Sequence, residues 1–114
     1  MKKLADSFKY ALHGIAELVR TQRNARVHLA LTFVVLGAAL MLKVTHYELA
    51  ILFLAMGLVW SAEAMNTAME LLADTLHPRR NAKVGRAKDL AAASVLLSAI
   101  AATCVAASIF YRFL

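Results

Sequence analysis

The hydrophobic pattern divides the chain into one amphipathic segment and three long apolar runs. The amphipathic segment covers residues 6–22, and its apolar positions at helical spacing are Phe8, Ala11, Leu12, Ile15, Leu18 and Val19. This segment is too polar to cross a bilayer, so we expect a helix lying along the membrane interface. It serves either as a surface anchor alone or as one wall of an active site as well.

The three apolar runs predict membrane spans at about residues 27–44, 48–76 and 88–112. At 1.5 Å per residue, the first span covers roughly 27 Å, which is just enough for the hydrocarbon core. The second run is longer than a bilayer requires, so its end should emerge into water. Pro78 ends this helix, and Asn81 is the predicted N-cap of the third, which starts before the membrane.

The composition supports a small integral membrane protein. Hydrophobic residues make up 61% of the 114 residues, which leaves too few polar side chains to cover a soluble globule. We therefore predict an all-α membrane protein in which residues 1–114 form a single domain. The one cysteine, Cys104, lies within an apolar run and is expected to be a buried, inert thiol.

The positive charge is unevenly distributed along the chain. Of the 13 Lys and Arg residues, all but Lys43 and Arg112 lie in the N-terminal segment or in the 77–88 loop. The positive-inside rule therefore places the N-terminus and this loop in the cytoplasm and the C-terminus outside. This placement explains the net charge of +6 without a nucleic-acid partner.

The second predicted span carries a polar face. Glu63, Asn66, Thr67, Glu70 and Asp74 fall on one side of a helix at 100° per residue. A carboxylate in or near hydrocarbon costs several kcal/mol unless it is paired, hydrated or neutralised. The face is therefore a candidate site that needs a compensating cation.

The residues themselves leave three kinds of function open. A proton-coupled transporter needs an intramembrane carboxylate, which Glu63 supplies. A phosphoryl-transfer enzyme needs acids for magnesium, cations for phosphate oxygens, and a base for the attacking hydroxyl. A non-catalytic helical membrane module would pair its acids internally with Arg or Lys.

Two spaced motifs connect this face to a known family. The first is Glu63-x-x-Asn66-Thr67-Ala68-x-Glu70-x-x-x-Asp74, and the second is Gly85-Arg86-Ala87-Lys88-Asp89. Together with Phe8-Lys9-Tyr10-Ala11-x-x-Gly14 and Arg23-Asn24-x-Arg26-x-His28, they resemble the prokaryotic diacylglycerol kinase family, which includes the undecaprenol kinases. The resemblance implies an ATP-dependent lipid kinase of the bacterial cytoplasmic membrane. It also implies a homotrimer with active sites between subunits at the cytoplasmic interface.

The resemblance assigns roles to the acids of the second span. Glu63 would be the general base that takes the proton from the lipid hydroxyl as it attacks the γ-phosphate of ATP. Glu70 would hold Mg²⁺ bridging the phosphates, and Asn66 would orient Glu63 or the phosphate.

Further residues would contact the nucleotide by the same resemblance. Lys88 would contact phosphate oxygens, Asp89 would fix the nucleotide or Lys88, and Tyr10 would lie near the nucleotide. The loop around Arg79, Arg80 and Asn81 departs from the family, and these residues would either contact the nucleotide or form a solvated loop that binds lipid headgroups.

Gln22 departs from the family pattern, in which a glutamate usually serves as a second metal-binding acid. A Gln carbonyl can ligate Mg²⁺ but contributes no negative charge. Either one metal is bound through Glu70 and ATP alone, or another acid such as Asp74 or Glu17 compensates, or activity is lost. We favour the first reading.

The choice of lipid alcohol rests on one segment and on the length of the N-terminus. The segment from Thr21 to His28 and the short N-terminus resemble the undecaprenol-kinase branch more than the diacylglycerol branch. Nothing in the apolar residues distinguishes an acyl chain from a polyprenyl chain.

Overall fold

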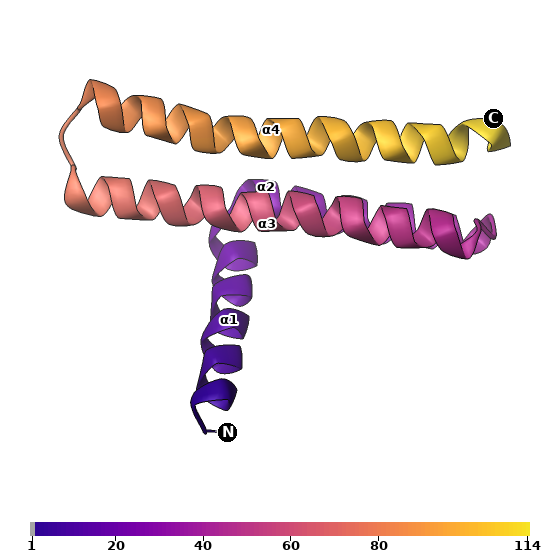
Figure 1. Ribbon diagram of the computed structural model, residues 1–114, viewed down its shortest axis with the longest axis horizontal. Coiled ribbons are helices and arrows are strands. Elements are labelled where there is room, and N and C mark those ends of the chain that lie inside the picture. The colour runs from indigo at the N-terminus through magenta and orange to yellow at the C-terminus, as the bar shows by residue number, and fades with distance from the viewer. Residues whose placement is uncertain (1) are drawn as a thin grey trace.

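The computed structural model describes residues 2–114, and these form four α-helices and a terminal 3₁₀ helix, with no strand. The elements are α1 (Lys2–Thr21), α2 (Arg23–Met41), α3 (His46–Leu76), α4 (Ala82–Phe110) and η1 (Tyr111–Phe113). Figure 1 shows α3 and α4 side by side, with α2 along one half of α3 and α1 projecting sideways from the middle of the bundle, away from α4. The predicted all-α fold is confirmed, and α2, α3 and the segment from Ala82 to Phe113 are each long and apolar enough to cross a membrane.

Several helix ends differ from the sequence prediction. α1 begins at Lys2 rather than residue 6, and α2 begins at Arg23 rather than residue 27. Polar residues that form helices well, such as Lys and Arg, extend a helix beyond its apolar stretch, which hydrophobic patterning alone does not detect. α4, in contrast, begins at Ala82, directly after the predicted cap Asn81 and before the predicted span, as expected.

α2 ends three residues earlier than predicted because the chain turns sharply after Met41. Lys43 has a positive φ of 56°, and its N–H donates to the carbonyl of Leu40 at 3.4 Å. The N–H of Val44 donates to the carbonyl of Ala39 at 3.2 Å. These two bonds form a Schellman motif, which satisfies carbonyls at the end of the helix and directs the chain into α3.

Side-chain caps fix the starts of α3 and α4. Thr45 and Glu48 form a capping box, in which each side chain accepts from the other residue's backbone N–H. The Asn81 side chain accepts from the backbone N–H groups of Lys83 and Val84, at 2.9 and 3.2 Å. The predicted N-cap at Asn81 is therefore confirmed.

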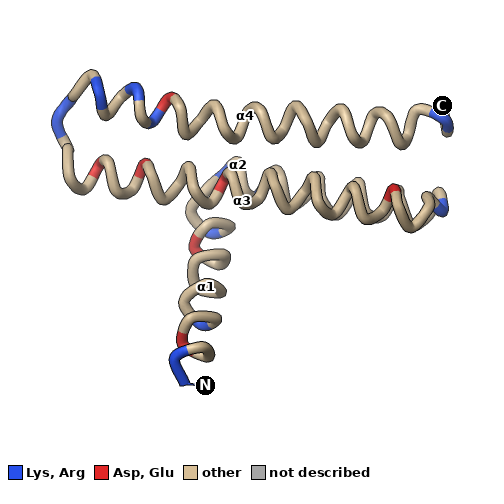
Figure 2. Tube along the Cα trace, viewed as in Figure 1, with Lys and Arg blue, Asp and Glu red and all other residues tan. Residues whose placement is uncertain are grey.

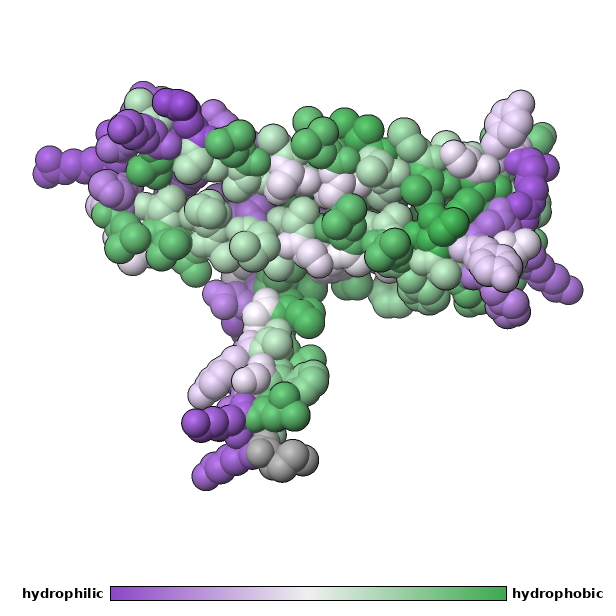
Figure 3. Space-filling model, in the orientation of Figure 1, coloured by the Kyte–Doolittle hydropathy of each residue, from purple (hydrophilic) through white to green (hydrophobic). Residues whose placement is uncertain are grey.

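Few side chains are buried in the single chain. Ala39, Leu52 and Ile109 form a small core where α2, α3 and α4 come together near the α2–α3 turn. Most apolar side chains of the three long helices point outward, and Figure 3 shows the resulting apolar surface along the bundle. Such a surface is stable only against lipid or other helices.

Cys104 is exposed on α4, so the prediction of a buried thiol is wrong for the single chain. An apolar run gives no information about which face of the helix packs against a neighbour, and Cys104 lies on a face that α3 does not cover. Trp60, by contrast, has a polar partner, because its Nε1 donates to Thr32 Oγ1 at 3.2 Å.

Most of the charges lie at the two ends of the bundle, on α1 and near the start of α2 (Figure 2). The α3–α4 turn and the start of α4 carry five basic residues. At the opposite end, Arg112 pairs with Glu48, and Nη2 lies 2.8 Å from Oε1. This pair joins the end of α4 to the start of α3.

Candidate active site

The polar residues predicted on one face lie on a single uninterrupted helix. α3 runs from His46 to Leu76, so Glu63, Asn66, Glu70 and Asp74 follow one another at spacings of three and four residues. Side chains at these spacings share a face. The structure pairs this face with α2 near Glu63 and with α4 near Asp74.

Glu63 is buried, with 2% of its surface exposed, and it faces an imidazole on α2. Glu63 Oε1 lies 3.1 Å from His28 Nε2, although the ring N–H is not aligned for a hydrogen bond. Oε1 has no hydrogen-bond partner within residues 2–114. A buried carboxylate that is not saturated with hydrogen bonds suits a group that accepts a proton from a substrate.

One turn further along α3, Asn66 contacts Glu70 rather than Glu63. Asn66 Nδ2 donates to Glu70 Oε1 at 3.3 Å. Asn66 Oδ1 is buried and has no partner in the part of the chain that the structure describes. The Glu70 carboxylate and this amide oxygen are therefore two oxygen acceptors that lie close together.

Lys88 on α4 reaches across to α3. Its Nζ lies 2.5 Å from Asp74 Oδ1, and the pair is on the surface. Asp89, the neighbouring acid, is exposed. Lys88 is thus held beside the α3 face by Asp74 and not by Asp89.

The remaining predicted residues stand apart from this set in the single chain. Tyr10 is exposed on α1, and Gln22 is half-buried at the junction of α1 and α2. The Gln22 side chain donates to Thr21 Oγ1 at 3.5 Å. Their predicted roles toward a nucleotide and a metal stay predictions.

The acids fit a magnesium ion that arrives with phosphate rather than a metal bound by the protein alone. Residues 2–114 contain no cluster of three or more His, Cys, Asp or Glu that could hold a metal. Magnesium commonly keeps several waters and binds through one or two carboxylates and substrate phosphates. Glu70, with the free Asn66 Oδ1 beside it, provides that kind of partial site.

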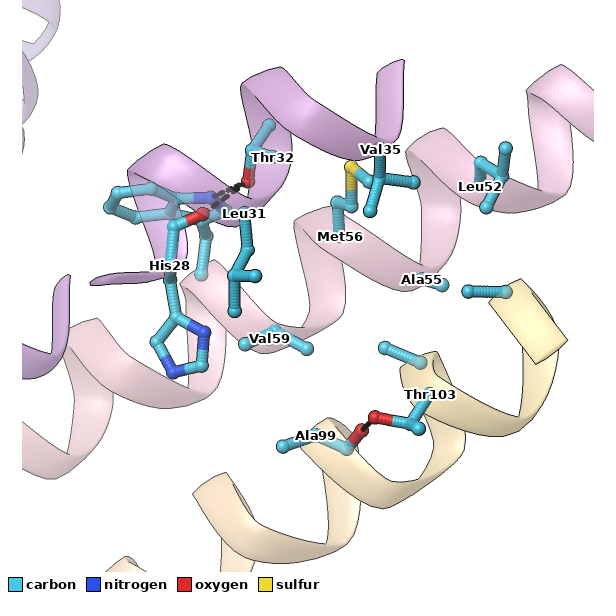
Figure 4. A pocket seen from close by; sticks show the side chains of 13 residues that line it. His28, Leu31, Thr32, Val35, Leu52, Ala55, Met56, Val59, Ala99 and Thr103 are labelled. Carbon is cyan, nitrogen blue, oxygen red and sulfur yellow. Dashed lines mark hydrogen bonds between the residues drawn. The ribbon is translucent and has the colours of Figure 1, made fainter. Parts of the chain in front are cut away.

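A pocket of about 250 Å³ lies between α2, α3 and α4, and its lining includes His28, which contacts Glu63 (Figure 4). His28 lies at one end and Leu52 at the other. Its lining is mostly aliphatic, and the polar exceptions are His28, Thr32, Trp60 and Thr103. The pocket therefore connects the level of Glu63 with the apolar interior of the bundle.

A second cavity, of about 510 Å³, lies between α1 and α3. α1 contributes residues between Ala11 and Leu18, and α3 contributes residues between Trp60 and Leu71. The amphipathic helix therefore meets α3 at the level of the polar face. Of its two predicted uses, this position favours the wall of a site over an anchor alone.

Sequence reasoning gave His28 no role of its own. It appears in the sequence analysis only within the motif Arg23-Asn24-x-Arg26-x-His28 and at the end of the segment from Thr21 to His28. Its position four residues before Thr32 puts both on one face of α2, but only the packing shows that this face meets Glu63 and Trp60.

Comparison with known proteins gives the same family as the motifs. Residues 9–110 match the prokaryotic diacylglycerol kinase family. An undecaprenol kinase from Bacillus subtilis is 32% identical over 110 residues, which cover 96% of this chain and 89% of that protein.

Two relatives named diacylglycerol kinase also match. The one from Synechocystis is 39% identical over 100 residues, 87% of this chain, but the match spans only 57% of that longer protein. The one from Haemophilus influenzae is 28% identical over 95 residues, 83% of this chain and 80% of that protein. Together these similarities support a lipid kinase function. The chain belongs to the prokaryotic diacylglycerol kinase family.

Proposed function

We propose that this protein transfers the γ-phosphoryl group of Mg-ATP to the hydroxyl of a membrane lipid alcohol at the cytoplasmic interface. The observation that carries the proposal is the buried Glu63, whose Oε1 has no hydrogen-bond partner in residues 2–114. It shares a helix face with Asn66 and Glu70. A base and a phosphate-bound metal ion are the two groups that such a reaction needs close together.

The position along α3 at which α1 packs supports a site at the membrane interface. α1 exposes Leu4, Phe8, Leu12 and Ile15, which suit burial in the headgroup boundary. If α1 lies in the membrane plane, the segment of α3 from Trp60 to Leu71 lies at the cytoplasmic surface. The start of α3 at His46 is then roughly 26 Å away from Glu63, close to the thickness of the hydrocarbon core.

This arrangement and the distribution of the basic residues support the topology that we propose. The N-terminus and the 77–88 loop are cytoplasmic, the C-terminus is outside, and the protein resides in the bacterial cytoplasmic membrane. The extensive apolar surface of the single chain supports assembly with further copies, for which we propose a homotrimer with active sites between subunits.

The reaction proceeds by in-line displacement. The lipid hydroxyl oxygen attacks the γ-phosphorus while its proton passes to Glu63, and the bond from the γ-phosphorus to the bridging oxygen of ADP breaks. Glu70 would hold the Mg²⁺ that arrives with the nucleotide, and the ion would neutralise charge on the phosphates when bound. Asn66 holds the Glu70 carboxylate in place through its amide N–H.

Lys88 would contact the nucleotide, and the pocket would accept the lipid. Lys88 exchanges its contact with Asp74 for phosphate oxygens when the nucleotide binds, with Asp89 and Tyr10 contacting the nucleotide. The pocket between α2, α3 and α4 lies below Glu63 and offers an apolar path for the chain of the lipid. We propose undecaprenol ahead of diacylglycerol, since the match to the Bacillus subtilis undecaprenol kinase covers nearly all of both chains.

Purified protein in mixed micelles with radiolabelled ATP and Mg²⁺ tests the proposal. Undecaprenol and diacylglycerol are supplied in turn, with no ion gradient present. Labelled undecaprenyl phosphate is the expected product. If neither alcohol is labelled and the protein instead moves solutes across vesicles in response to a proton gradient, it is a transporter and the proposal is wrong.

A further inference from the structure

The contact between α2 and α3 at Glu63 is made by two adjacent turns. His28 Nε2 lies 3.1 Å from Glu63 Oε1, and four residues later Thr32 Oγ1 accepts from Trp60 Nε1 at 3.2 Å. The Thr32 hydroxyl also donates to the carbonyl of His28 at 2.7 Å. The turn that carries His28 is therefore anchored to α3 three residues before Glu63.

His28 contacts Glu63 and also lines the apolar pocket between α2, α3 and α4. Its side chain retains 21% exposure, whereas that of Glu63 retains 3%, and it is one of the few polar groups in the pocket lining. Within residues 2–114, Glu63 is the one acid with a carboxylate oxygen within 4.0 Å of the imidazole. The imidazole is thus placed to act on this carboxylate and on no other acid of the α3 face.

The contact between His28 and Glu63 differs from a structural ion pair that is fully hydrogen-bonded. The ring nitrogen is near the oxygen, yet its N–H is not aligned with it, so the carboxylate is not saturated. Catalytic hydrogen bonds are often poorly aligned without substrate and tighten when the reacting groups are assembled. A purely structural pair in a buried site gains its stability from full alignment, which is missing here.

We propose that His28 is a positioning residue for Glu63 in the phosphoryl transfer. With Nε2 as donor, the imidazole fixes one carboxylate oxygen and leaves the other directed at the hydroxyl of the lipid that enters along the pocket. The carboxylate then receives the proton in a defined orientation. This inference rests on the proposed function. It adds His28, a residue of α2, as the group that positions the general base Glu63 on α3.

The test compares His28→Leu, which removes the donor, with His28→Gln, whose amide N–H extends to a similar position. His13→Leu is the control, because His13 is exposed on α1. Turnover of lipid alcohol is measured at saturating Mg-ATP in mixed micelles. His28→Leu should lower kcat by about 10- to 100-fold, the usual effect of removing a group that orients a functional side chain. The KM for Mg-ATP and the activity of His13→Leu should not change, and His28→Gln should recover most of the rate.

A double-mutant cycle separates positioning from a structural role. If His28 acts through Glu63, its removal should change kcat by less than about twofold once Glu63→Gln is already present, because residues that act as a unit are not additive. An equal loss in both backgrounds means that His28 only supports the fold, and the inference is overturned. If His28→Leu does not fold, His28→Asn, whose shorter side chain withdraws the donor, takes its place in the cycle.

The activities of the wild-type protein and of His28→Leu separate a failure of the His28 role from a failure of the proposed function. An active wild-type protein with an equally active His28→Leu variant overturns the inference alone. A wild-type protein that phosphorylates no lipid alcohol overturns the proposed function and the inference together.

Discussion

Lys88 on α4 lies 2.5 Å from Asp74 on α3, and the contact joins the two helices at the end that carries the basic turn. Both side chains are accessible to solvent, so the pair adds little to stability. The contact matters because it fixes the position of the Lys88 ammonium group. The ammonium group is held beside the acidic face of α3, where a nucleotide phosphate can compete with Asp74 for it.

Lys88→Ala should therefore weaken nucleotide binding. Loss of a hydrogen bond from a charged donor to phosphate should raise the KM for Mg-ATP by about tenfold or more. Asp74→Asn should have a smaller effect, because it removes only the partner of the nucleotide-free state. Lys83→Ala is the matched control on the same helix, and equal KM values for Lys88→Ala and Lys83→Ala would remove Lys88 from the nucleotide site.

Glu63→Gln should abolish most of the activity without affecting nucleotide binding. The amide keeps the shape of the side chain but cannot take the hydroxyl proton, and loss of a general base costs typically ~10²–10⁴ in rate. Radiometric turnover and equilibrium binding of ATP measure the two properties separately. A Glu63→Gln protein with wild-type turnover would show that another group is the base.

Glu70→Gln should change the magnesium dependence instead. A neutral amide is a poorer ligand for Mg²⁺ than a carboxylate, so more magnesium should be needed for half-maximal rate, and nucleotide affinity should fall with it. The measurement is a magnesium titration of turnover at fixed ATP. An unchanged titration midpoint would exclude Glu70 as a metal ligand.

Gln22→Glu tests the position where the chain departs from its family. An added carboxylate in the metal shell should lower the magnesium concentration at half-maximal rate. Superimposable titration curves for the two proteins, or a worse one for the Glu variant, would place Gln22 outside the shell. Its side chain would then only contribute to the α1–α2 junction, where it contacts Thr21.

Asn81→Ala should destabilise α4 without changing the chemistry. The Asn81 side chain accepts from two backbone N–H groups at the start of the helix, and loss of such a cap costs about 1 kcal/mol. Thermal unfolding in detergent measures the effect. Asn81→Asp keeps the acceptor oxygen and should retain the wild-type unfolding temperature, and a similar loss in both variants would argue against a capping role.

The three apolar helices, the cap at Asn81 and the polar face can be predicted from the sequence alone. The apolar runs show where three helices must lie, because backbone groups in lipid have to be bonded within the helix. The spacing of Glu63, Asn66, Glu70 and Asp74 placed them on one side of α3, since that depends only on the period of the helix. Asn81 was identifiable as a cap from its residue type and its place after Pro78.

The residues of α2 and α4 that contact this face are known only from the packing of the helices. The contact of Glu63 with His28 and that of Asp74 with Lys88 depend on how α2 and α4 are rotated and displaced along α3. The exposure of Cys104 depends on the same rotation. The period of the helix fixes which residues share a face within one helix. Which residues of a neighbouring helix contact that face depends on how the two helices pack. Many sequences of small and aliphatic residues allow several such packings.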